Sequence, residues 1–219
     1  THVDRSLVDD SPFWQSNLTG ARVLAEEVLQ REIRLVQVST DEVYGDGACC
    51  PDPWTENAPL NPGNPYAVTK AAADMILSVY SRRSDHPLDV VITRGTNTIG
   101  PRQFPEKAVP KAIWCFLNGH PFPLFQSPAR RMWMSVYDHA RGVEAALRRG
   151  KRGQIYHLAP DIRNEVYTHQ IIESVREMLG MGEITQVPDR QGYDLRYRLD
   201  STKTRRELGW KPRWELEDT

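Results

Sequence analysis

Short apolar segments alternate with longer amphipathic segments along most of the chain, and this alternation constrains the fold more than any other feature. The expected strands are short and have little polar content: residues 34–39, 89–93, 133–136, 154–158 and 184–187. The expected helices have apolar positions three and four apart: residues 11–31, 66–82, 106–117, 138–149, 167–179 and 202–208. Strands that alternate with helices predict an α/β fold in which helices cover both faces of a parallel sheet.

Several boundaries follow from single residues. Ser11 and Pro12 are typical of a helix start, with Ser as the N-cap and Pro in the first turn. Asp138 is expected to cap the helix that follows it, and Pro110 must lie in the first turn of its helix or break it. Loops or extended segments are expected at residues 45–65, 95–105 and 121–125.

The composition argues against two classes of partner. A net charge of −1 gives no field that would attract nucleic acid or a membrane surface. No apolar run approaches the roughly 20 residues that span a bilayer, and no signal peptide opens the chain.

The three cysteines, Cys49, Cys50 and Cys115, lack metal-ligand spacing, and their odd number argues against a disulfide framework. We expect reduced thiols, no metal and a cytoplasmic location.

A hydroxyl and two adjacent carboxylates follow the first expected strand, in the stretch Ser39–Gly45. Thr40, Asp41 and Glu42 come directly after the apolar residues, and ligands of open parallel sheets bind beyond the carboxyl ends of the strands. The alternative is a turn that uses Thr and Asp for local hydrogen bonds. Such a turn explains Asp41 but does not require Glu42 beside it.

Tyr66 and Lys70 are four residues apart at the start of the next expected helix, so they share one face. An ammonium beside a phenol lowers the pKa of the phenol, which would make Tyr66 a base for a sugar hydroxyl. With eight tyrosines in the chain, one lysine at this spacing could also be coincidence. Together with the cluster at Thr40, however, the pair supplies the groups that move protons around a carbonyl.

Seven motifs, in order along the chain, resemble the extended short-chain dehydrogenase/reductase family: STDEVYG, NPYAVTK, RGTNTIGPRQFPEKAVPKAI, RMWMSVYDHARGV, GQIYHLAP, DRQGYDLRY and ELGWKP. Within it they most resemble the nucleoside-diphosphate-glucose 4,6-dehydratases, and the dTDP-glucose enzymes are closest in pattern. The similarity covers essentially the whole chain and begins inside the fourth strand of that family. The preceding part, with the glycine-rich NAD loop, would therefore be absent.

The resemblance implies a reaction in three stages. Tyr66 removes a proton from the glucosyl C4 hydroxyl while C4 passes a hydride to NAD, and Thr40 hydrogen-bonds that oxygen. Glu42 then removes the C5 proton and Asp41 protonates the departing C6 hydroxyl, so that water is lost. The hydride returns to C6 and leaves a 4-keto-6-deoxy sugar. Two adjacent carboxyls with separated pKa values can serve as base and acid for one elimination.

The resemblance also implies binding roles. The cofactor side would be lined by Asn17, Ser39, Tyr66, Lys70 and Thr98. The sugar nucleotide would be held by His2, Thr40, Asn97, Lys107, Pro123, Phe125, Arg131, His157, Arg190 and Tyr193. Arginine suits a diphosphate because its planar fork bonds two oxygens at once. Singly, each arginine could instead be a solvated surface charge, as we expect for Arg130, and His2 could be an ordinary loop histidine.

The chain departs from the family pattern mainly on the nucleotide side. His157 stands where Asn is usual, Met132 where Asp is common, and Phe125 where the family often has Tyr. Gln191 and Tyr193 replace a Pro and a His, and Thr98 replaces an Asn on the cofactor side. The catalytic residues match, so the resemblance supports the reaction more strongly than it identifies the nucleotide base.

We expect a Rossmann-type NAD domain that lacks its N-terminal part, formed by residues 1–99 and 130–159, and a smaller discontinuous substrate lobe, residues 100–129 and 160–219. The resemblance implies a homodimer in which residues 11–31 and 66–82 form a four-helix bundle, although the alanines of these helices also suit burial against the sheet.

Two alternatives stay open. One is an epimerase or decarboxylase of the same superfamily, which Asp41 and Glu42 make less favourable; the other is a non-catalytic remnant that binds a sugar nucleotide.

Overall fold

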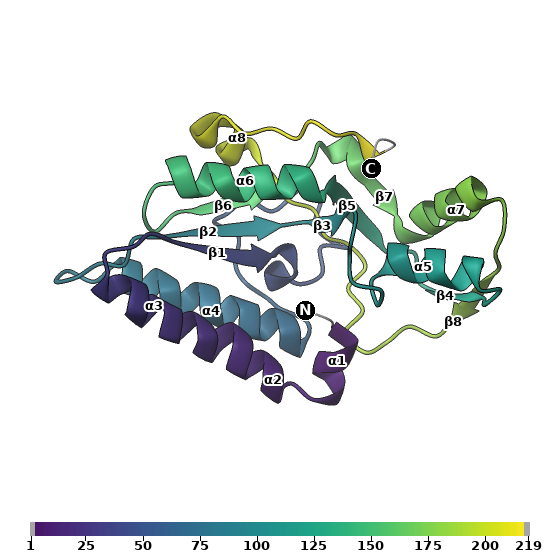
Figure 1. The fold of residues 1–219 in the computed structure, drawn as a ribbon, viewed down its shortest axis with the longest axis horizontal. Helices are drawn as coiled ribbons and strands as arrows, with labels where there is room; N and C mark the ends of the chain where they lie inside the picture. Colours follow the sequence, from purple (N-terminus) through teal and green to yellow (C-terminus); the bar gives the residue numbers. More distant parts are fainter. Residues whose placement is uncertain (1–2, 217–219) are drawn as a thin grey trace.

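The computed structural model describes residues 3–216. Its main sheet has three parallel strands in the order β1 (Leu35–Thr40), β2 (Val90–Gly95) and β6 (Ile155–Leu158). Leu35 pairs with Val90 and Thr40 with Gly95. Figure 1 shows helices on both faces of this sheet, as the alternation of apolar segments predicted. All six residues of β2 are buried, in keeping with its central place.

One face of the main sheet is covered by two long helices that lie side by side (Figure 1). They are α3 (Gly20–Gln30) and α4 (Pro65–Ser81). Alanines of both helices, including Ala25 and Ala73, pack with Leu77 against the sheet. The small side chains therefore serve burial within the chain. The opposite face of the sheet carries α6 (Val136–Arg149) and α8 (Thr202–Leu208).

The segment expected as one helix over residues 11–31 is more complex. It consists of α2 (Ser11–Phe13), a π-helix η1 (Trp14–Thr19) and then α3, with Pro12 in the first turn as expected. Asp10, and not Ser11, occupies the N-cap position. A short helix that the sequence did not predict, α1 (Val3–Val8), precedes it.

A second small sheet contains β3 (Asn97–Ile99), β5 (Arg130–Ser135) and β7 (Glu165–Tyr167). β3 runs parallel to β5, and β7 runs antiparallel to it. One expectation is corrected here, because the loop predicted at residues 95–105 contains β3. Of the strands that follow residue 129, β6 pairs with the main sheet and β5 pairs with β3.

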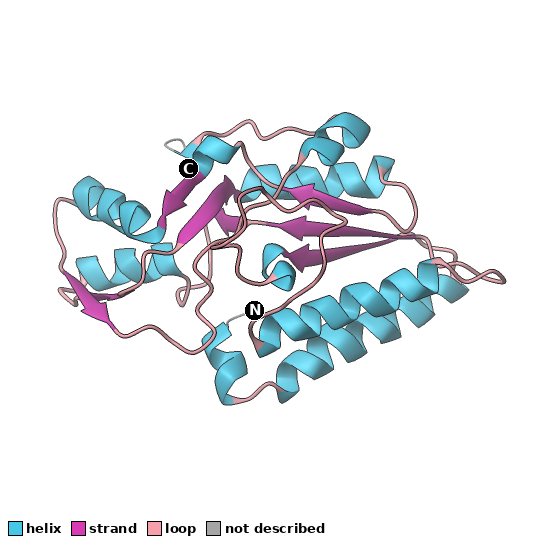
Figure 2. Ribbon diagram, turned by 180° about the vertical axis from the view of Figure 1, so that it is seen from behind, coloured by secondary structure: helices cyan, strands magenta, loops and turns pink. Residues whose placement is uncertain are grey.

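A third group lies apart from the main sheet and contains β4 (Phe122–Phe125) and β8 (Ile184–Val187), which are parallel. Helices α5 (Ala108–Leu117) and α7 (Thr168–Leu179) pack beside them around Phe116, Phe122 and Ile172. Figure 2 shows this group separated from the longer strands by the small second sheet. Pro110 lies in the first turn of α5, as predicted. The division into two domains stays a prediction.

The start of α6 corrects one prediction. Ser135 is its N-cap and accepts a hydrogen bond from the Tyr137 amide at 3.3 Å. Asp138 is fully buried inside the first turn and accepts amide bonds from Arg213 and Trp214 at 2.7 and 3.0 Å. It therefore ties the C-terminal segment to the helix.

The cysteines are unpaired: Cys49 is exposed, Cys50 partly exposed and Cys115 buried. Within residues 3–216 no group of three or more potential metal-binding side chains comes together. No helix in that range is long and apolar enough to cross a membrane.

Candidate active site

The turn that follows β1 places two carboxyls beyond the carboxyl end of the main sheet. Thr40 is extended, and its hydroxyl accepts a hydrogen bond from the Glu42 amide at 3.3 Å, which starts the 3-10 helix η2 (Asp41–Tyr44). Gly45 ends this turn with φ 77°, and a Cβ there would lie 2.0 Å from the carbonyl oxygen of Asn61. The glycine of the STDEVYG motif is thus required by the close approach of the following loop.

The two carboxyls of η2 differ in exposure, because Asp41 is buried and Glu42 is partly buried beside the pocket. Asp41 is 3% exposed, and burial, followed by the neighbouring Glu42, raises its pKa to about 7. Its Oδ1 accepts a hydrogen bond from the Thr40 hydroxyl at 3.2 Å, whereas Oδ2 has no partner among the described residues. Burial also raises the pKa of Glu42, and a hydrogen bond from Asn64 opposes this rise. Asp41 can therefore carry a proton near neutral pH and has a free oxygen with which to donate it.

Tyr66 and Lys70 lie on one face of α4, as their spacing predicted, but Lys70 is not among the groups that shift the pKa of Tyr66. The Thr40 hydroxyl hydrogen-bonds Tyr66, and burial followed by the charges of Glu42 and Asp41 raises the pKa of Tyr66 above its usual range. The Lys70 ammonium donates instead to the Val38 carbonyl at 2.5 Å. The expectation that Lys70 lowers the pKa of the Tyr66 phenol is therefore wrong when only the residues of this chain are considered.

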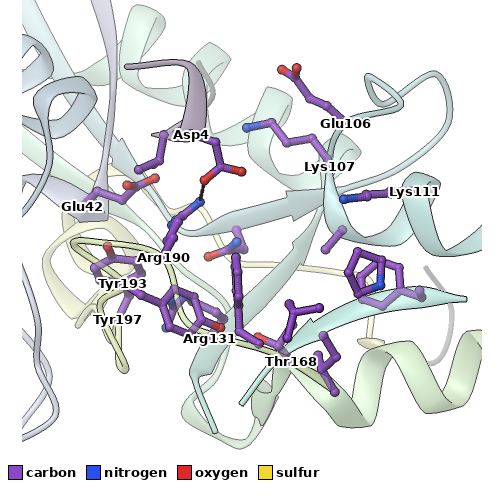
Figure 3. Close-up of a pocket in the computed structure, with 18 of the residues that line it drawn as sticks. Asp4, Glu42, Glu106, Lys107, Lys111, Arg131, Thr168, Arg190, Tyr193 and Tyr197 are labelled. Atoms are coloured by element: carbon purple, nitrogen blue, oxygen red, sulfur yellow. Dashed lines mark hydrogen bonds and ion pairs between the residues drawn. The ribbon is translucent and has the colours of Figure 1, made fainter. Parts of the chain in front are cut away.

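A pocket of about 400 Å³ opens beside Glu42 and extends toward α5 and β4. Figure 3 shows charged side chains on its walls, with Lys107 and Arg190 directed toward the side where Glu42 and Asp4 lie. Eight of the residues expected to bind the sugar nucleotide or to act in catalysis line it: Glu42, Asn97, Lys107, Pro123, Phe125, Arg131, Arg190 and Tyr193. Residues more than 140 positions apart in the sequence therefore meet at one cavity.

Two arginines and two aromatic rings form the wall opposite α5. The Arg131 guanidinium lies 4.4 Å from the centre of the Tyr197 ring and donates to the carbonyls of Arg130 and Asp194. Arg190 lies 5.6 Å from the Tyr193 ring. These contacts hold both cations at the pocket in an orientation that suits an anionic ligand.

Arg130 turns away from the pocket, as expected. Its guanidinium stacks 4.3 Å from the centre of the Tyr167 ring and hydrogen-bonds the hydroxyl of that residue. Adjacent residues of a strand point to opposite faces, so Arg131 faces the pocket and Arg130 does not.

Phe125 and Tyr193 make an aromatic pair at the pocket, with ring centres 4.6 Å apart. Phe125 comes from β4 and Pro123 lies two residues before it on the same strand, so both can face the cavity that they line. An apolar wall with cations beside it can hold a flat base next to a phosphate group.

His157 does not line the pocket, which corrects its expected role in substrate binding. It is fully buried on β6. Its Nε2 lies 2.6 Å from the Tyr44 hydroxyl, and its Nδ1 lies 3.0 Å from the Asp200 carbonyl. Burial lowers its pKa to about 3. His157 is a neutral core residue that closes a hydrogen-bond chain.

Four of the five residues expected on the cofactor side lie on η1, β1 and α4, and Thr98 lies apart on β3. The Asn17 amide donates to the Thr69 hydroxyl at 2.9 Å. The buried Ser39 lies next to Asp74, and its hydroxyl hydrogen bond to that carboxyl opposes the rise of the Asp74 pKa. Thr98 on β3 donates to the Thr96 carbonyl at 3.1 Å. His2 lies outside the described residues.

Sequence reasoning missed several residues that line the pocket: Asp4, Lys111, Trp133, Thr168 and Tyr197. Lys111 could have been found, because it lies four residues after Lys107 and so on the same face of α5. Tyr197 had no comparable signal, since its role depends on the contact with Arg131 that only the fold creates.

Comparison with known proteins gives the family. A family model described as GDP-mannose 4,6 dehydratase matches residues 1–219. The chain belongs to this family. Membership confirms the expectation from the motifs, and with it the Rossmann-type α/β fold.

This chain, as a member of the family, is similar to several named proteins. It is 39% identical to the dTDP-glucose 4,6-dehydratase of Streptomyces griseus over 225 residues, which covers 100% of this chain and 66% of that protein. Its structure matches the crystal structure of DesIV (dTDP-glucose 4,6-dehydratase) from Streptomyces venezuelae with NAD and TYD bound, with a TM-score of 0.93, 38% identity and coverage of 100% and 67%.

An epimerase has the same fold. The UDP-glucose 4-epimerase of Thermus thermophilus, in complex with NAD, matches with a TM-score of 0.90, 28% identity and coverage of 100% of this chain and 71% of that one. The fold alone therefore does not separate the two reactions. The chain spans about two thirds of the length of the dehydratases that it matches.

Proposed function

We propose that this chain provides the catalytic carboxyls and the substrate pocket of an NAD-dependent enzyme that dehydrates a nucleoside-diphosphate-glucose to its 4-keto-6-deoxy sugar. The observation that carries the proposal is the pair Asp41 and Glu42, two adjacent carboxyls at the edge of a cation-lined pocket, of which Asp41 is buried and Glu42 partly buried. An elimination needs one group to take the C5 proton and another to give a proton to the leaving hydroxyl. The pair supplies both.

The two carboxyls have different surroundings, and this assigns their roles. The pKa of Asp41 is about 7, so it is partly protonated at neutral pH and acts as the acid on the C6 hydroxyl. Glu42 receives a hydrogen bond from Asn64, which stabilises its charged form. Glu42 lines the pocket and acts as the base on C5. Thr40 hydrogen-bonds Tyr66, and we therefore assign both hydroxyls to the C4 oxygen.

The residues around β1 fit a dinucleotide. We assign Tyr66 and Lys70 to the nicotinamide ribose, with Asn17, Ser39 and Thr98 along the same side. The position of the buried Ser39 at the carboxyl end of β1 supports this assignment. NAD, when bound, takes a hydride from C4, returns it to C6, and brings a positive charge that favours the ionised form of Tyr66.

The pocket fits a nucleoside diphosphate. Lys107, Arg131 and Arg190 supply three cations for two phosphate groups, and Phe125 with Pro123 supplies an apolar surface for the base. We assign Asn97 and Tyr193 to the same ligand. The dehydratases that this chain resembles are named for dTDP-glucose, so a thymidine nucleotide is the substrate that we propose first.

Two exposed apolar surfaces on α3 and α4 support a homodimer. Val23 and Leu24 are 51% and 56% exposed, and Met75 and Val79 are 61% and 52% exposed. Because the alanines of these helices already face the sheet, the exposed residues form a second apolar face. Two copies that bury these faces together would make a four-helix bundle. We also propose a cytoplasmic location, consistent with free cysteines.

An epimerase is the competing function, supported by the shared fold with the UDP-glucose 4-epimerase. An epimerase inverts C4 and eliminates nothing, so it does not need both an acid and a base at C5 and C6. The full chain, incubated with NAD and a panel of nucleoside-diphosphate-glucoses, should yield a 4-keto-6-deoxy sugar detectable by mass spectrometry as the loss of water. Inversion at C4 without loss of water would establish the epimerase, and no turnover of any member would support the non-catalytic remnant.

A further inference from the structure

Asp74 and Arg94 form a buried ion pair below the candidate active site that the proposed reaction does not use. The Arg94 Nε lies 3.0 Å from Asp74 Oδ2, and the two side chains are 3% and 1% exposed. Asp74 follows Tyr66 and Lys70 at intervals of four residues on α4, so all three lie on one face of the helix. Arg94 comes from β2, the central strand of the main sheet.

A directed chain of hydrogen bonds continues from Arg94 through the core. Arg94 Nη1 donates to the Tyr44 hydroxyl at 2.6 Å, and that hydroxyl lies 2.6 Å from His157 Nε2. His157 Nδ1 lies 3.0 Å from the Asp200 carbonyl, which can only accept. Nδ1 therefore carries the proton, Nε2 accepts from Tyr44, and each member has one fixed role. A neutral His157 agrees with its lowered pKa.

This chain reaches the turn that carries the two catalytic carboxyls. Tyr44 is the last residue of η2, and Asp41 is the first. The guanidinium of Arg94 also lies 4.9 Å from the centre of the Tyr44 ring. Tyr44 is only three residues from Asp41 within one short turn, so a Tyr44 side chain fixed in the core restricts the backbone of that turn. Arg94 and Tyr44 thereby limit the movement of Asp41 and Glu42.

The other end of the ion pair acts on Lys70. Burial lowers the pKa of Lys70, and the negative charge of Asp74 opposes this shift. The Lys70 ammonium also donates to the Val38 carbonyl on β1, and Tyr66 lies one turn before it on the same helix. Among the charged groups that the structure describes there, Asp74 is the one that favours an ammonium ion.

We propose that Asp74 is a positioning residue of this site, which keeps Lys70 charged and, through Arg94 and Tyr44, fixes the turn that carries Asp41 and Glu42. The proposal rests on the proposed function, because that function makes Lys70 and the two carboxyls its working groups. Stability alone explains the pair poorly, since a buried ion pair often stabilises a fold no more than apolar residues of similar volume. Removal of one partner, in contrast, leaves an uncompensated buried charge.

Two variants separate this role from folding. Asp74→Asn removes the anion but leaves Arg94 buried and unpaired, so it could fail through instability. The double variant Asp74→Asn with Arg94→Gln removes both charges and keeps two amides that can bond each other. The matched control is Asp89→Asn with Arg34→Gln, because Arg34 Nε pairs with Asp89 Oδ2 at 2.9 Å away from the site.

The first measurement is independent of activity. The pKa of the Lys70 ammonium is read from the pH dependence of its Cε resonance in lysine-labelled full chain, assigned with Lys70→Arg. We expect a decrease of about one unit in the double variant, as for loss of a nearby opposite charge, and none in the control variant. An unchanged Lys70 pKa in a folded double variant would overturn the proposal.

The second measurement is turnover. In the double variant we expect kcat to fall about tenfold, the alkaline limb of the kcat profile to move to lower pH, and KM for the sugar nucleotide to stay within about twofold. Full activity with an unshifted limb in the double variant would leave Asp74 a structural residue and contradict the proposal. If the wild-type chain itself gives no dehydration, the proposed function fails, while the Lys70 titration still decides the action of Asp74.

Discussion

Asn64 joins Glu42 to the first turn of α4. Its Nδ2 donates to Glu42 Oε2 at 3.2 Å, and its Oδ1 accepts from the Ala67 amide at 2.9 Å. One side chain therefore caps the helix that carries Tyr66 and Lys70 and also orients the proposed base. The two motifs of the site, which lie about twenty residues apart in the sequence, are coupled through this amide.

Asn64→Ser tests this coupling. Serine is also a good N-cap, so the melting temperature should change little, but its side chain is too short to reach Glu42. Loss of the hydrogen bond raises the pKa of Glu42. Because a base must be deprotonated, the acid limb of the kcat/KM profile should move to higher pH by up to about one unit. An acid limb at the wild-type position would show that Asn64 does not tune Glu42.

Glu42→Gln should stop the reaction after its first stage. The amide cannot remove the C5 proton, whereas Thr40 and Tyr66 at C4 remain in place. We expect reduced nicotinamide to accumulate by absorbance, with no 4-keto-6-deoxy product by mass spectrometry. Glu144→Gln on the exposed face of α6 is the control and should react normally. If Glu42→Gln instead abolished nicotinamide reduction and spared elimination, the roles assigned here would be reversed.

Asp41→Asn should stabilise the protein in a pH-dependent way. The pKa of Asp41 is near 3.8 when unfolded and about 7 when folded. Its neutral form is thus favoured by folding, and the stability that Asp41 contributes is lost as pH rises from about 4 through 7. The melting temperature of the Asn variant relative to wild type should therefore increase over this range and level off above it. A difference that is constant with pH would contradict the raised pKa.

Arg131→Met and Arg130→Met form a matched pair on β5. Charge-assisted hydrogen bonds contribute about 1.5–3 kcal/mol each, so loss of Arg131 should raise KM for the sugar nucleotide by about tenfold or more. Arg130 stacks on Tyr167 outside the pocket, so its variant should keep KM within about twofold. Binding of the nucleoside diphosphate alone, measured by calorimetry, should show the same contrast.

Met75→Glu with Val79→Glu should separate the proposed dimer, because two charges would be buried in an apolar interface. The molecular mass in solution, by sedimentation or light scattering, should fall to that of one chain. Met178→Glu, at a site that is 78% exposed on α7, should leave the mass unchanged. A monomeric wild type would remove the basis of this prediction.

Much of the fold follows from local sequence. The strand at residues 34–39, the helix at 66–82 and the strand at 184–187 appear within one or two residues of their predicted bounds. Each has a strong apolar period or clear end signals. β3 was missed because its three residues, Asn97–Ile99, have no period of their own and exist through pairing with β5. The cap at α6 was misplaced because Ser135 ends a strand that reads as apolar.

The candidate site, like the fold, could be predicted from the sequence only where local signals exist. Thr40, Asp41, Glu42, Tyr66 and Lys70 could be found because each pair of neighbours is close in sequence. The electrostatics could not be predicted from the sequence. The pKa of Tyr66 depends on burial and on carboxylates of another segment, and these raise it in spite of the lysine four residues away. His157 was assigned by its place in a motif, but the direction of its side chain into the core depends on Tyr44 and Asp200.

Before any ligand binds, Arg190 already holds an anion, because its Nη1 lies 2.5 Å from Asp4 Oδ1 (Figure 3). A phosphate that bound at this arginine, as we propose, would therefore replace one negative group with another. The guanidinium stays neutralised in both states, so the strength of binding depends on how much better a phosphate fits the fork than a carboxylate does. Displacement of Asp4 would remove one contact of α1, whereas Val3 and Ser6 of this helix would still be held against Tyr66 on α4.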